Sequence, residues 1–152
     1  MEIKNYNNKE FQLIYKNEFA TLYYNAQLMI AICSAEAEYI PIDNFKEVFL
    51  KISNFIIQSP IKHFIFDKRN LRTFHQPSME WYFAIWKPTV KINGLTNHYK
   101  ILPQLLWFEK AVQAGKHEIL SKYGDDLLEG INVVYYSSIE EVIESIESKA
   151  IG

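Results

Sequence analysis

The chain has 152 residues, a length that predicts one domain with a core able to bury about 70% of the surface that the unfolded chain exposes. Hydrophobic residues make up 49%, and 16 basic against 18 acidic residues give a net charge of −2, which favours a globular protein over a disordered one. The single cysteine, Cys33, excludes an intramolecular disulfide and a multi-cysteine zinc site. We find no apolar run typical of a signal peptide or a membrane-spanning helix, so we expect a cytoplasmic protein.

Charge is distributed unevenly along the chain. Residues 1–59 carry five basic and seven acidic side chains, residues 60–124 carry ten and four, and residues 125–152 carry one and seven, so the local balances are −2, +6 and −6. The middle segment suits phosphate or an acidic partner, but an acidic tail folded nearby would cancel much of its field. We therefore do not expect general nucleic-acid binding.

The N-terminal part predicts an antiparallel meander. Three runs within residues 11–34, FQLIY, FATLYY and QLMIAIC, are rich in β-branched and aromatic residues, and the turn-prone Asn17, Asn25 and Ala26 separate them. These residues predict three strands joined by short turns.

From Pro41 the hydrophobic period changes to that of a helix, with Asp43 as the expected N-cap and Ser59 and Pro60 at its end. Its apolar face consists of Phe45, Val48, Phe49, Ile52, Phe55 and Ile56. The run from Ile61 to Asp67 (IKHFIFD) then predicts a short central strand that is buried on both faces.

Further helices and strands alternate after this strand. Pro77 suits the first position of a helix that runs to about Pro88, and residues 97–103 predict a strand. A third helix fits from about Gln104 to Tyr123, although Gly115 weakens its middle.

The C-terminal part predicts a strand over Asn132–Tyr136 and a final helix, for which Ser138 and Glu141 form a capping box. The apolar face of this helix consists of Ile139, Val142, Ile143 and Ile146. The whole order indicates an α/β fold in which the meander joins a mixed sheet, with parallel later strands, right-handed crossovers and about four packed helices.

The segments FIFDKRNL, PSMEWYFAIWKP and NVVYYSSIEEVIESI, in this order of elements, resemble the STAS-like (SpoIIAA-like) domains, in a bacterial branch of small stand-alone proteins. The resemblance covers nearly the whole chain. The matching positions are Asp67, Arg69 and Leu71 at the strand end, Glu80 and Trp81 in the second helix, and Tyr136 with residues 137–141. The resemblance implies a regulatory module that binds another protein or itself.

Anti-sigma factor antagonists of the same fold carry an Asp-Ser-Ser-Gly-Leu-like segment whose serine is phosphorylated. The corresponding residues 75–79 read HQPSM, which departs from that pattern at the aspartate, the first serine and the glycine. Ser78 is the hydroxyl left as a phosphoacceptor candidate. We expect no phosphorylation there by a kinase of the anti-sigma type.

Asp67 lies at the carboxyl end of the predicted central strand, where ligands of open α/β sheets bind. Lys68, Arg69, Arg72 and His75 then form a cationic loop that leads to the positive N-terminus of the second helix and suits an anion. The alternative is that Asp67 and Arg69 order the loop by hydrogen bonds to each other and to the backbone.

Trp81 and Ile85 lie opposite the apolar stripe of the second helix, and Trp107 lies off the stripe of the third. A helix that is apolar on two faces is either sandwiched between neighbouring elements or docked on another molecule. These three residues are therefore candidates for a homodimer or partner interface. Packing of the two helices against each other inside the monomer is the alternative.

No metal site or cofactor is expected. None of the four histidines forms a His-x-x-x-His or Glu-x-x-His pair, and the sequence has no Gly-rich phosphate loop and no Gly-x-Ser-x-Gly motif. Cys33 is expected to be a buried, inert thiol unless a histidine meets it in space.

The sequence favours a non-enzymatic STAS-like module that acts by protein–protein interaction or self-association. The alternatives are a binder of a small anionic or lipid-like ligand, because the fold is similar to lipid-carrier domains and the chain is rich in aromatic residues, and an enzyme. An apolar closed pocket beside Arg69 would favour the ligand, and a flat exposed aromatic patch would favour a protein partner. A histidine within hydrogen-bond reach of Cys33 or Asp67 would favour an enzyme.

Overall fold

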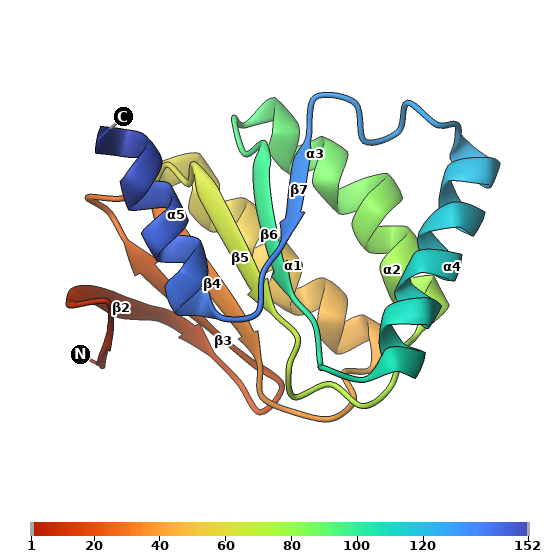
Figure 1. The fold of residues 1–152 in the computed structure, drawn as a ribbon, viewed down its shortest axis with the longest axis horizontal. Coiled ribbons are helices and arrows are strands. Elements are labelled where there is room, and N and C mark those ends of the chain that lie inside the picture. Colours follow the sequence, from red (N-terminus) through yellow and green to blue (C-terminus); the bar gives the residue numbers. More distant parts are fainter. Residues whose placement is uncertain (1, 152) are drawn as a thin grey trace.

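A seven-stranded sheet organises the chain, and its strands lie side by side in the order of the sequence (Figure 1). The computed structural model describes residues 2–151, with side chains up to residue 149. The strands are β1 (Ile3–Tyr6), β2 (Lys9–Lys16), β3 (Ala20–Asn25), β4 (Ile30–Ala35), β5 (His63–Asp67), β6 (Asn97–Ile101) and β7 (Asn132–Tyr135). Strands β1 to β4 pair antiparallel and β4 to β7 pair parallel, which confirms the predicted mixed sheet.

Helices cover both faces of this sheet. They are α1 (Ile42–Gln58), α2 (Gln76–Trp81), the π-helical turn η1 (Tyr82–Trp86), α3 (Lys87–Ile92), α4 (Leu106–Tyr123) and α5 (Ile139–Ile151). One hydrophobic cluster joins one sheet face to α1, α4 and the continuous helix formed by α2, η1 and α3, and a second joins the opposite face to α5 (Figure 1). No helix within residues 2–151 is long and apolar enough to cross a membrane.

Strand β1 was not among the expected elements. It pairs with β2 through a tight turn at Asn7 and Asn8, whose φ angles are 52° and 65°. Two positive φ angles in succession are typical of a type I′ hairpin turn, and asparagine tolerates them better than most residues. Three of the four residues of β1 are exposed, so the strand has little hydrophobic pattern by which the sequence could reveal it.

The predicted central strand is confirmed. Strand β5 pairs in parallel with β4 on one side and β6 on the other. Phe64, Ile65 and Phe66 are each at most 1% exposed, because helices pack on both faces of the sheet at this position. The carboxyl end of β5 therefore lies between two neighbouring strands and not at the side of the sheet.

The predicted N-cap of α1 is wrong. Pro41 occupies the cap position, without a side-chain hydrogen bond, and its carbonyl accepts from the backbone N–H of Phe45 at 2.8 Å. Asp43 lies in the first turn, where its carboxylate still complements the partial positive charge of the helix N-terminus. The predicted apolar face is confirmed, since Val48, Phe49 and other residues of that face are buried.

The second helix is longer than predicted, because Pro88 does not end it. A regular α-helix would place the ring of Pro88 against the carbonyl of Ala84, four residues earlier. Instead, the N–H of Lys87 donates to the carbonyl of Tyr82, five residues earlier, and this wider turn lets the helix continue to Ile92. Turns of this kind are frequent at functional sites.

The third helix begins at Leu106, two residues later than predicted, and Leu105 occupies its N-cap. Gly115 in its middle has a packing reason: a Cβ there would lie 2.8 Å from Cζ of Phe74. The close approach lets Gln76 Nε2 donate to the carbonyl of Gly115 at 3.2 Å. Helix α4 is therefore held against α2.

The C-terminal prediction is confirmed to within one residue, since β7 ends at Tyr135 rather than Tyr136. The backbone N–H of Glu141 donates to Ser138 Oγ at 3.2 Å, as a capping box requires. The predicted apolar residues of α5, Ile139 and Val142 among them, pack in the second hydrophobic cluster.

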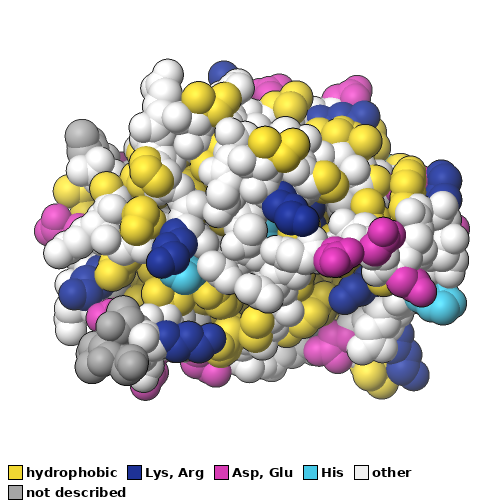
Figure 2. Space-filling view, turned by 90° about the horizontal axis from the view of Figure 1, so that it is seen from above, with side chains coloured by type: hydrophobic (Ala, Val, Ile, Leu, Met, Phe, Trp, Pro, Cys, Tyr) yellow, Lys and Arg dark blue, Asp and Glu magenta, His cyan; other side chains and the backbone are white. Residues whose placement is uncertain are grey.

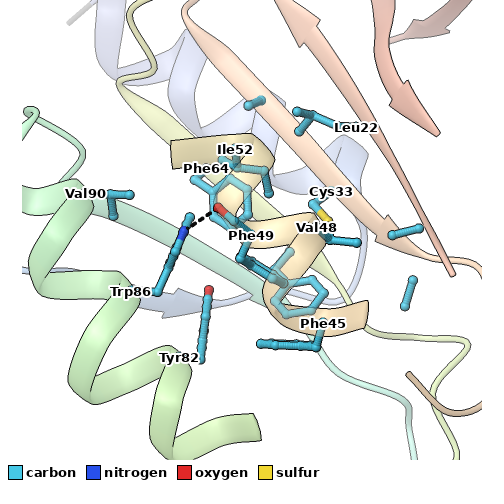
Figure 3. Close-up of a cluster of buried hydrophobic side chains, with 14 of the residues drawn as sticks. Leu22, Cys33, Phe45, Val48, Phe49, Ile52, Phe64, Tyr82, Trp86 and Val90 are labelled. Carbon is cyan, nitrogen blue, oxygen red and sulfur yellow. Dashed lines mark hydrogen bonds between the residues drawn. The ribbon is translucent and has the colours of Figure 1, made fainter. Parts of the chain in front are cut away.

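Aromatic rings fill the space between α1, the sheet and η1 (Figure 3). The ring of Phe49 lies about 5 Å from those of Phe66, Tyr82 and Trp86. Trp86 Nε1 donates to the carbonyl of Phe49 at 2.7 Å, and its ring stacks on that of Tyr82 at 5.2 Å. This packing fixes η1 against the sheet and orients the side chains that follow it.

Candidate functional site

The loop after β5 is ordered by its own ion pair. Arg69 Nε and Nη2 donate to the two carboxylate oxygens of Asp67 at 2.9 and 2.8 Å, and the backbone N–H of Arg69 donates to the same carboxylate at 3.0 Å. Two parallel bonds of this kind hold both side chains in one geometry. Asp67 and Arg69 therefore satisfy each other, as in the alternative stated for this loop.

Two further residues of the expected anion site bind neighbouring groups of the protein. Arg72 Nη1 donates to the carbonyls of Arg69 and Leu71 at 2.7 and 2.8 Å. His75 is the N-cap of α2, and its Nδ1 accepts from the backbone N–H of Ser78 at 3.3 Å. The buried hydroxyl of Ser78 lies 2.9 Å from the same nitrogen, so a phosphate on Ser78 would require this first turn to open.

Lys68 points away from these residues and into the protein. It is buried, and its Nζ lies 5.0 Å from the ring centre of Phe66 and 5.9 Å from that of Tyr82. Lys68 and Phe66 share one side of the extended chain because side chains alternate along a strand. The structure thus separates Lys68 from Asp67, Arg69 and Arg72, whereas Lys68 and His75 both line one small hollow.

Two more lysines lie in the same part of the interior. Lys87, the first residue of α3, and Lys100, in β6, are both 0% exposed, and neither Nζ has a hydrogen-bond partner within residues 2–151. A fully buried lysine without a partner is rare, because transfer of an ammonium group from water to an apolar interior is very unfavourable. We call Lys68, Lys87 and Lys100 the lysine cluster.

Aromatic faces line the lysine cluster. Lys100 Nζ lies 4.6 Å from the ring centre of Tyr82 and 4.5 Å from that of Phe83, and Lys87 Nζ lies 5.2 and 4.7 Å from the same two rings. Ring faces attract cations at such distances. They do not replace the hydrogen bonds that an ammonium group makes in water.

The environment of the lysine cluster favours uncharged amines. Burial lowers the pKa of Lys68 from 10.5 to about 8. Burial, and then repulsion from Lys68, lowers the pKa of Lys87 and that of Lys100 well below 10.5. Removal from water and neighbouring like charges both disfavour the protonated form.

Two other titratable side chains share this interior. His98 lies two residues before Lys100 on β6, so both face the same side of the sheet. Burial, then the charges of Lys87 and Lys100, lowers the pKa of His98 to about 2. Burial raises the pKa of Tyr82, whose buried hydroxyl has no hydrogen-bond partner in the described part of the chain. Both groups therefore stay neutral at physiological pH.

A cleft of about 490 Å³ lies between α4 and the carboxyl end of β7, and Lys68, Lys87 and Lys100 are not among its lining residues. Val112 and Lys116 of α4 line it, as do Tyr135 and Ser137 on the other side. Tyr135 pairs in register with Lys100 across β6 and β7, so the two side chains emerge as neighbours on one face of the sheet. The charge of Lys116 lowers the pKa of Lys87 and that of Lys100, which places it within electrostatic reach of both amines.

A second hollow, of only about 50 Å³, lies under the loop after β5. Lys68, Leu71 and Tyr82 are among its lining residues, and Arg69 is not. This volume suits one or two water molecules rather than an organic ligand. The cleft beside α4 is therefore the better candidate for a ligand site.

The three interface candidates differ in their surroundings. Trp81 is partly buried, and its ring meets that of Phe45 edge to face at 6.2 Å, so it is sandwiched between its own helix and α1. Ile85 is 54% exposed and Trp107 is 51% exposed. Trp81 thus lies in an internal contact, whereas Ile85 and Trp107 face solvent.

Cys33 is buried in the larger hydrophobic cluster, and burial raises the pKa of its thiol, which disfavours the nucleophilic thiolate. His63 Nδ1 lies 2.9 Å from the hydroxyl of Tyr99, and His75 caps α2. Among the described residues, no group of three or more His, Cys, Asp or Glu side chains could hold a metal ion.

On the face shown in Figure 2, the basic side chains do not form a positive patch. Lys and Arg side chains there are scattered among Asp, Glu and hydrophobic side chains. Three lysines of the middle segment, Lys68, Lys87 and Lys100, lie instead in the interior.

The sequence contained signals for the residues that the predictions missed. Lys87 lies four residues after Phe83 and three before Val90, within the apolar stripe of its helix. Lys100 lies in the strand predicted over residues 97–103, two residues after His98. A polar residue on an expected core face is the informative exception to burial rules, and here it marks the cluster.

Comparisons with protein-family models, with curated proteins and with solved structures gave no match to this chain.

Proposed function

We propose that this protein binds a small anionic ligand in the cleft between α4 and β7, and that the lysine cluster provides the positive charge for it. One observation carries the proposal: Lys87 and Lys100 are completely buried, without a hydrogen-bond partner within residues 2–151, and Lys100 pairs in register with Tyr135, which lines the cleft. Strongly perturbed titratable groups beside a cleft are typical of functional sites.

A role in stabilising the fold does not explain why these lysines are buried. A buried polar group without a partner destabilises the folded state, and three neighbouring amines repel one another whenever more than one is protonated. An anion that enters the cluster would offset this repulsion and supply hydrogen-bond acceptors. The lysine cluster is therefore unfavourable for the free protein and favourable for a complex with an anion.

The other charges of the cleft restrict the ligand. Two exposed carboxylates, Glu109 and Glu141, line the cleft together with Lys116. They repel a highly charged ligand as it enters. A small ligand with a single negative charge, such as a carboxylate, fits both the mixed charge of the cleft and its volume.

Binding of such an anion should take up a proton. The pKa of Lys68 is lowered to about 8, and those of Lys87 and Lys100 are well below 10.5. The anion favours the protonated amine, so its affinity should rise as the pH falls toward these pKa values and decrease as the pH rises above them. Tyr82 and His98 stay neutral in this range and do not contribute.

The test is calorimetric titration of the protein with acetate and with inorganic phosphate at pH 6 and pH 8. We expect acetate to bind more tightly at pH 6, and we expect Lys100→Met to lose this binding. Lys110→Met is the matched control, because Lys110 lies exposed on α4, and it should bind as the wild type does.

The proposal would be overturned if neither acetate nor phosphate bound to the wild-type protein. Equal binding by wild type and Lys100→Met would do so as well. If Lys100→Met does not fold, Lys87→Met removes the other wholly buried amine and provides the same test.

Self-association is the second candidate function. The observation that favours it is the exposure of Ile85 on η1 and of Trp107 on α4, each more than half accessible. Large hydrophobic side chains at such exposure are enriched in protein interfaces. The partner we infer is a second copy of this chain.

The order of elements and the segment FIFDKRNL support a further proposal, that the chain is a STAS-like domain. On this view it is a cytoplasmic, regulatory and non-enzymatic module. Ligand binding in the cleft and self-association would then be the two means by which it responds to and acts on other molecules.

A further inference from the structure

Resting on the anion site proposed above, we propose that the amine of Lys100 captures the carbonyl group of a small 2-oxo acid as an imine. The geometry supplies three parts for this reaction: an amine buried beside a second amine, a hydroxyl with no hydrogen-bond partner in residues 2–151, and a cleft lined by Tyr135, the neighbour of Lys100 in register. The ligand class follows from what each part can recognise.

The first part is the amine. An imine forms only from an uncharged amine, whose lone pair is free to react. A lysine acquires such an amine at neutral pH when it is buried in apolar surroundings or lies next to another cation. Lys100 satisfies both conditions, since it is wholly buried and shares the Tyr82 and Phe83 rings with Lys87.

Lys100 is the reacting amine rather than Lys87 because of its place in the sheet. Its neighbour in register, Tyr135, lines the cleft. Tyr135 lies on the edge strand β7 and is itself 44% exposed, so entry of a ligand from the cleft to the buried Lys100 requires rotation of this exposed side chain. Lys87 lies on α3, and no residue of that helix is among those that line the cleft.

The reaction is balanced without an oxidant or a reductant. The nitrogen of Lys100 attacks the carbonyl carbon, the C–N bond forms, and the carbonyl oxygen takes up a proton to give a carbinolamine. The hydroxyl then leaves as water while the C=N bond forms. One amine and one carbonyl compound give one imine and one water, and the two amine hydrogens leave with the oxygen.

Neighbouring groups favour each stage. The hydroxyl of Tyr82, buried and without a partner in the described residues, is available to donate a hydrogen bond to the carbonyl oxygen. When the imine is protonated, its positive charge lies close to the faces of Tyr82 and Phe83, 4.6 and 4.5 Å from the present position of Lys100 Nζ. Aromatic faces stabilise a desolvated cation at such distances.

The carboxylate of a 2-oxo acid would favour the protonated form of a neighbouring lysine and pair with it. Lys68 after β5, Lys87 of α3 and Lys116 of α4 lie within electrostatic reach of Lys100, and His98 of β6 is neutral. A simple aldehyde would leave these amines without an acceptor. A ligand with a second or third negative charge would be repelled by Glu109 and Glu141 at the cleft.

The experiment is reductive trapping with pyruvate as the probe. The protein is incubated with pyruvate and cyanoborohydride, which reduces an imine to a stable secondary amine, and peptide mass spectrometry locates the modified lysine. We expect one adduct per chain, on Lys100. Lys100→Met should lose the adduct, while Lys110→Met should keep it, with circular dichroism showing that both variants are folded.

The outcomes separate this inference from the anion site itself. Acetate binding without a pyruvate adduct would overturn the imine and leave the anion site standing. An adduct on Lys87, or adducts spread over exposed lysines, would overturn the assignment to Lys100. Absence of both acetate binding and adduct would overturn the two proposals together.

Discussion

At Asp67, Lys68 and Arg69, three successive charged side chains have different roles. The buried Asp67 at the end of β5 binds the half-exposed Arg69 of the loop that follows, and Lys68 between them points to the opposite face of the sheet, where it is buried. The alternation of side chains along an extended segment explains this division, because Lys68 continues the inward face of Phe66. A cluster of charges that is continuous in the sequence is therefore split into an ordering ion pair and a buried amine.

Replacement of Lys100 by methionine should stabilise the folded protein. Methionine has a similar shape and no group that requires a hydrogen bond, so Lys100→Met removes a buried donor that lacks a partner within residues 2–151. Such a group destabilises the fold by roughly 1–3 kcal/mol. Urea denaturation at pH 7 should therefore show a higher free energy of unfolding for Lys100→Met than for the wild type.

The pH dependence of the free energy of unfolding tests whether the stabilisation by Lys100→Met comes from the loss of the buried amine. The pKa of Lys100 is well below 10.5 in the folded protein, so the unfolded chain binds a proton that the folded chain lacks, and the free energy of unfolding rises with pH up to about 10.5. Lys100→Met lacks this contribution, and its advantage should shrink as the pH approaches 10.5. Lys110→Met should lie within about 0.5 kcal/mol of the wild type, and a destabilised Lys100→Met would contradict the prediction.

At the scale of single elements, the sequence predicted those strands and helices whose hydrophobic pattern was strong. The spacing of Phe45, Val48 and Phe49 predicted α1, and the uniformly apolar run IKHFIFD predicted the buried strand β5. Both patterns survive in the structure because burial of a whole face dominates the energetics of an element.

The elements that were missed depend on local geometry rather than on pattern. Strand β1 is mostly exposed and is held by a turn at Asn7 and Asn8. The second helix passes Pro88 because the backbone adopts a wider turn at η1. The lysine cluster was missed for a third reason: it forms where η1, β5 and β6 meet, and the distance between Lys87 and Lys100 depends on packing that the sequence alone does not reveal.

Truncation of Phe66 should test the central place of β5. Phe66 is 1% exposed, and its ring lies 5.0 Å from that of Phe49 and 5.8 Å from that of Tyr82. Phe66→Ala should lower the free energy of unfolding by roughly 3–5 kcal/mol, the range for loss of a buried phenyl ring. Ile57→Ala, at an exposed position on α1, should change it by less than about 0.5 kcal/mol.

Amide hydrogen exchange provides an independent measurement on the same strand. The amides of β5 lie between two hydrogen-bonded neighbours, so they should exchange only when the protein unfolds globally. Exchange in β5 as fast as in the exposed strand β1 would show that the strand is not central.

At the scale of the whole molecule, the sheet separates two hydrophobic clusters of different character. The face covered by α5 carries the buried carboxylate of Asp67, which is paired with Arg69, whereas the face covered by α1 to α4 contains the lysine cluster. The cleft lies on that second side, between α4 and β7. The proposed ligand cleft and the exposed Trp107 thus both lie on α4. This helix therefore connects the proposed ligand binding with the proposed self-association.

Self-association should depend on Trp107 and not on Trp81. Trp107 is 51% exposed, and a large aromatic residue at the centre of an interface contributes about 2 kcal/mol or more, so Trp107→Ala should weaken a dimer by about thirtyfold, since each 1.4 kcal/mol is tenfold. Trp81→Ala removes an edge-to-face contact with Phe45 and should instead lower the stability of the monomer.

Sedimentation equilibrium measures the weakening of the dimer, and thermal unfolding measures the stability of the monomer. A wild type that remains monomeric at high concentration would exclude the dimer, and a Trp107→Ala variant that unfolds would mean that the ring supports the monomer.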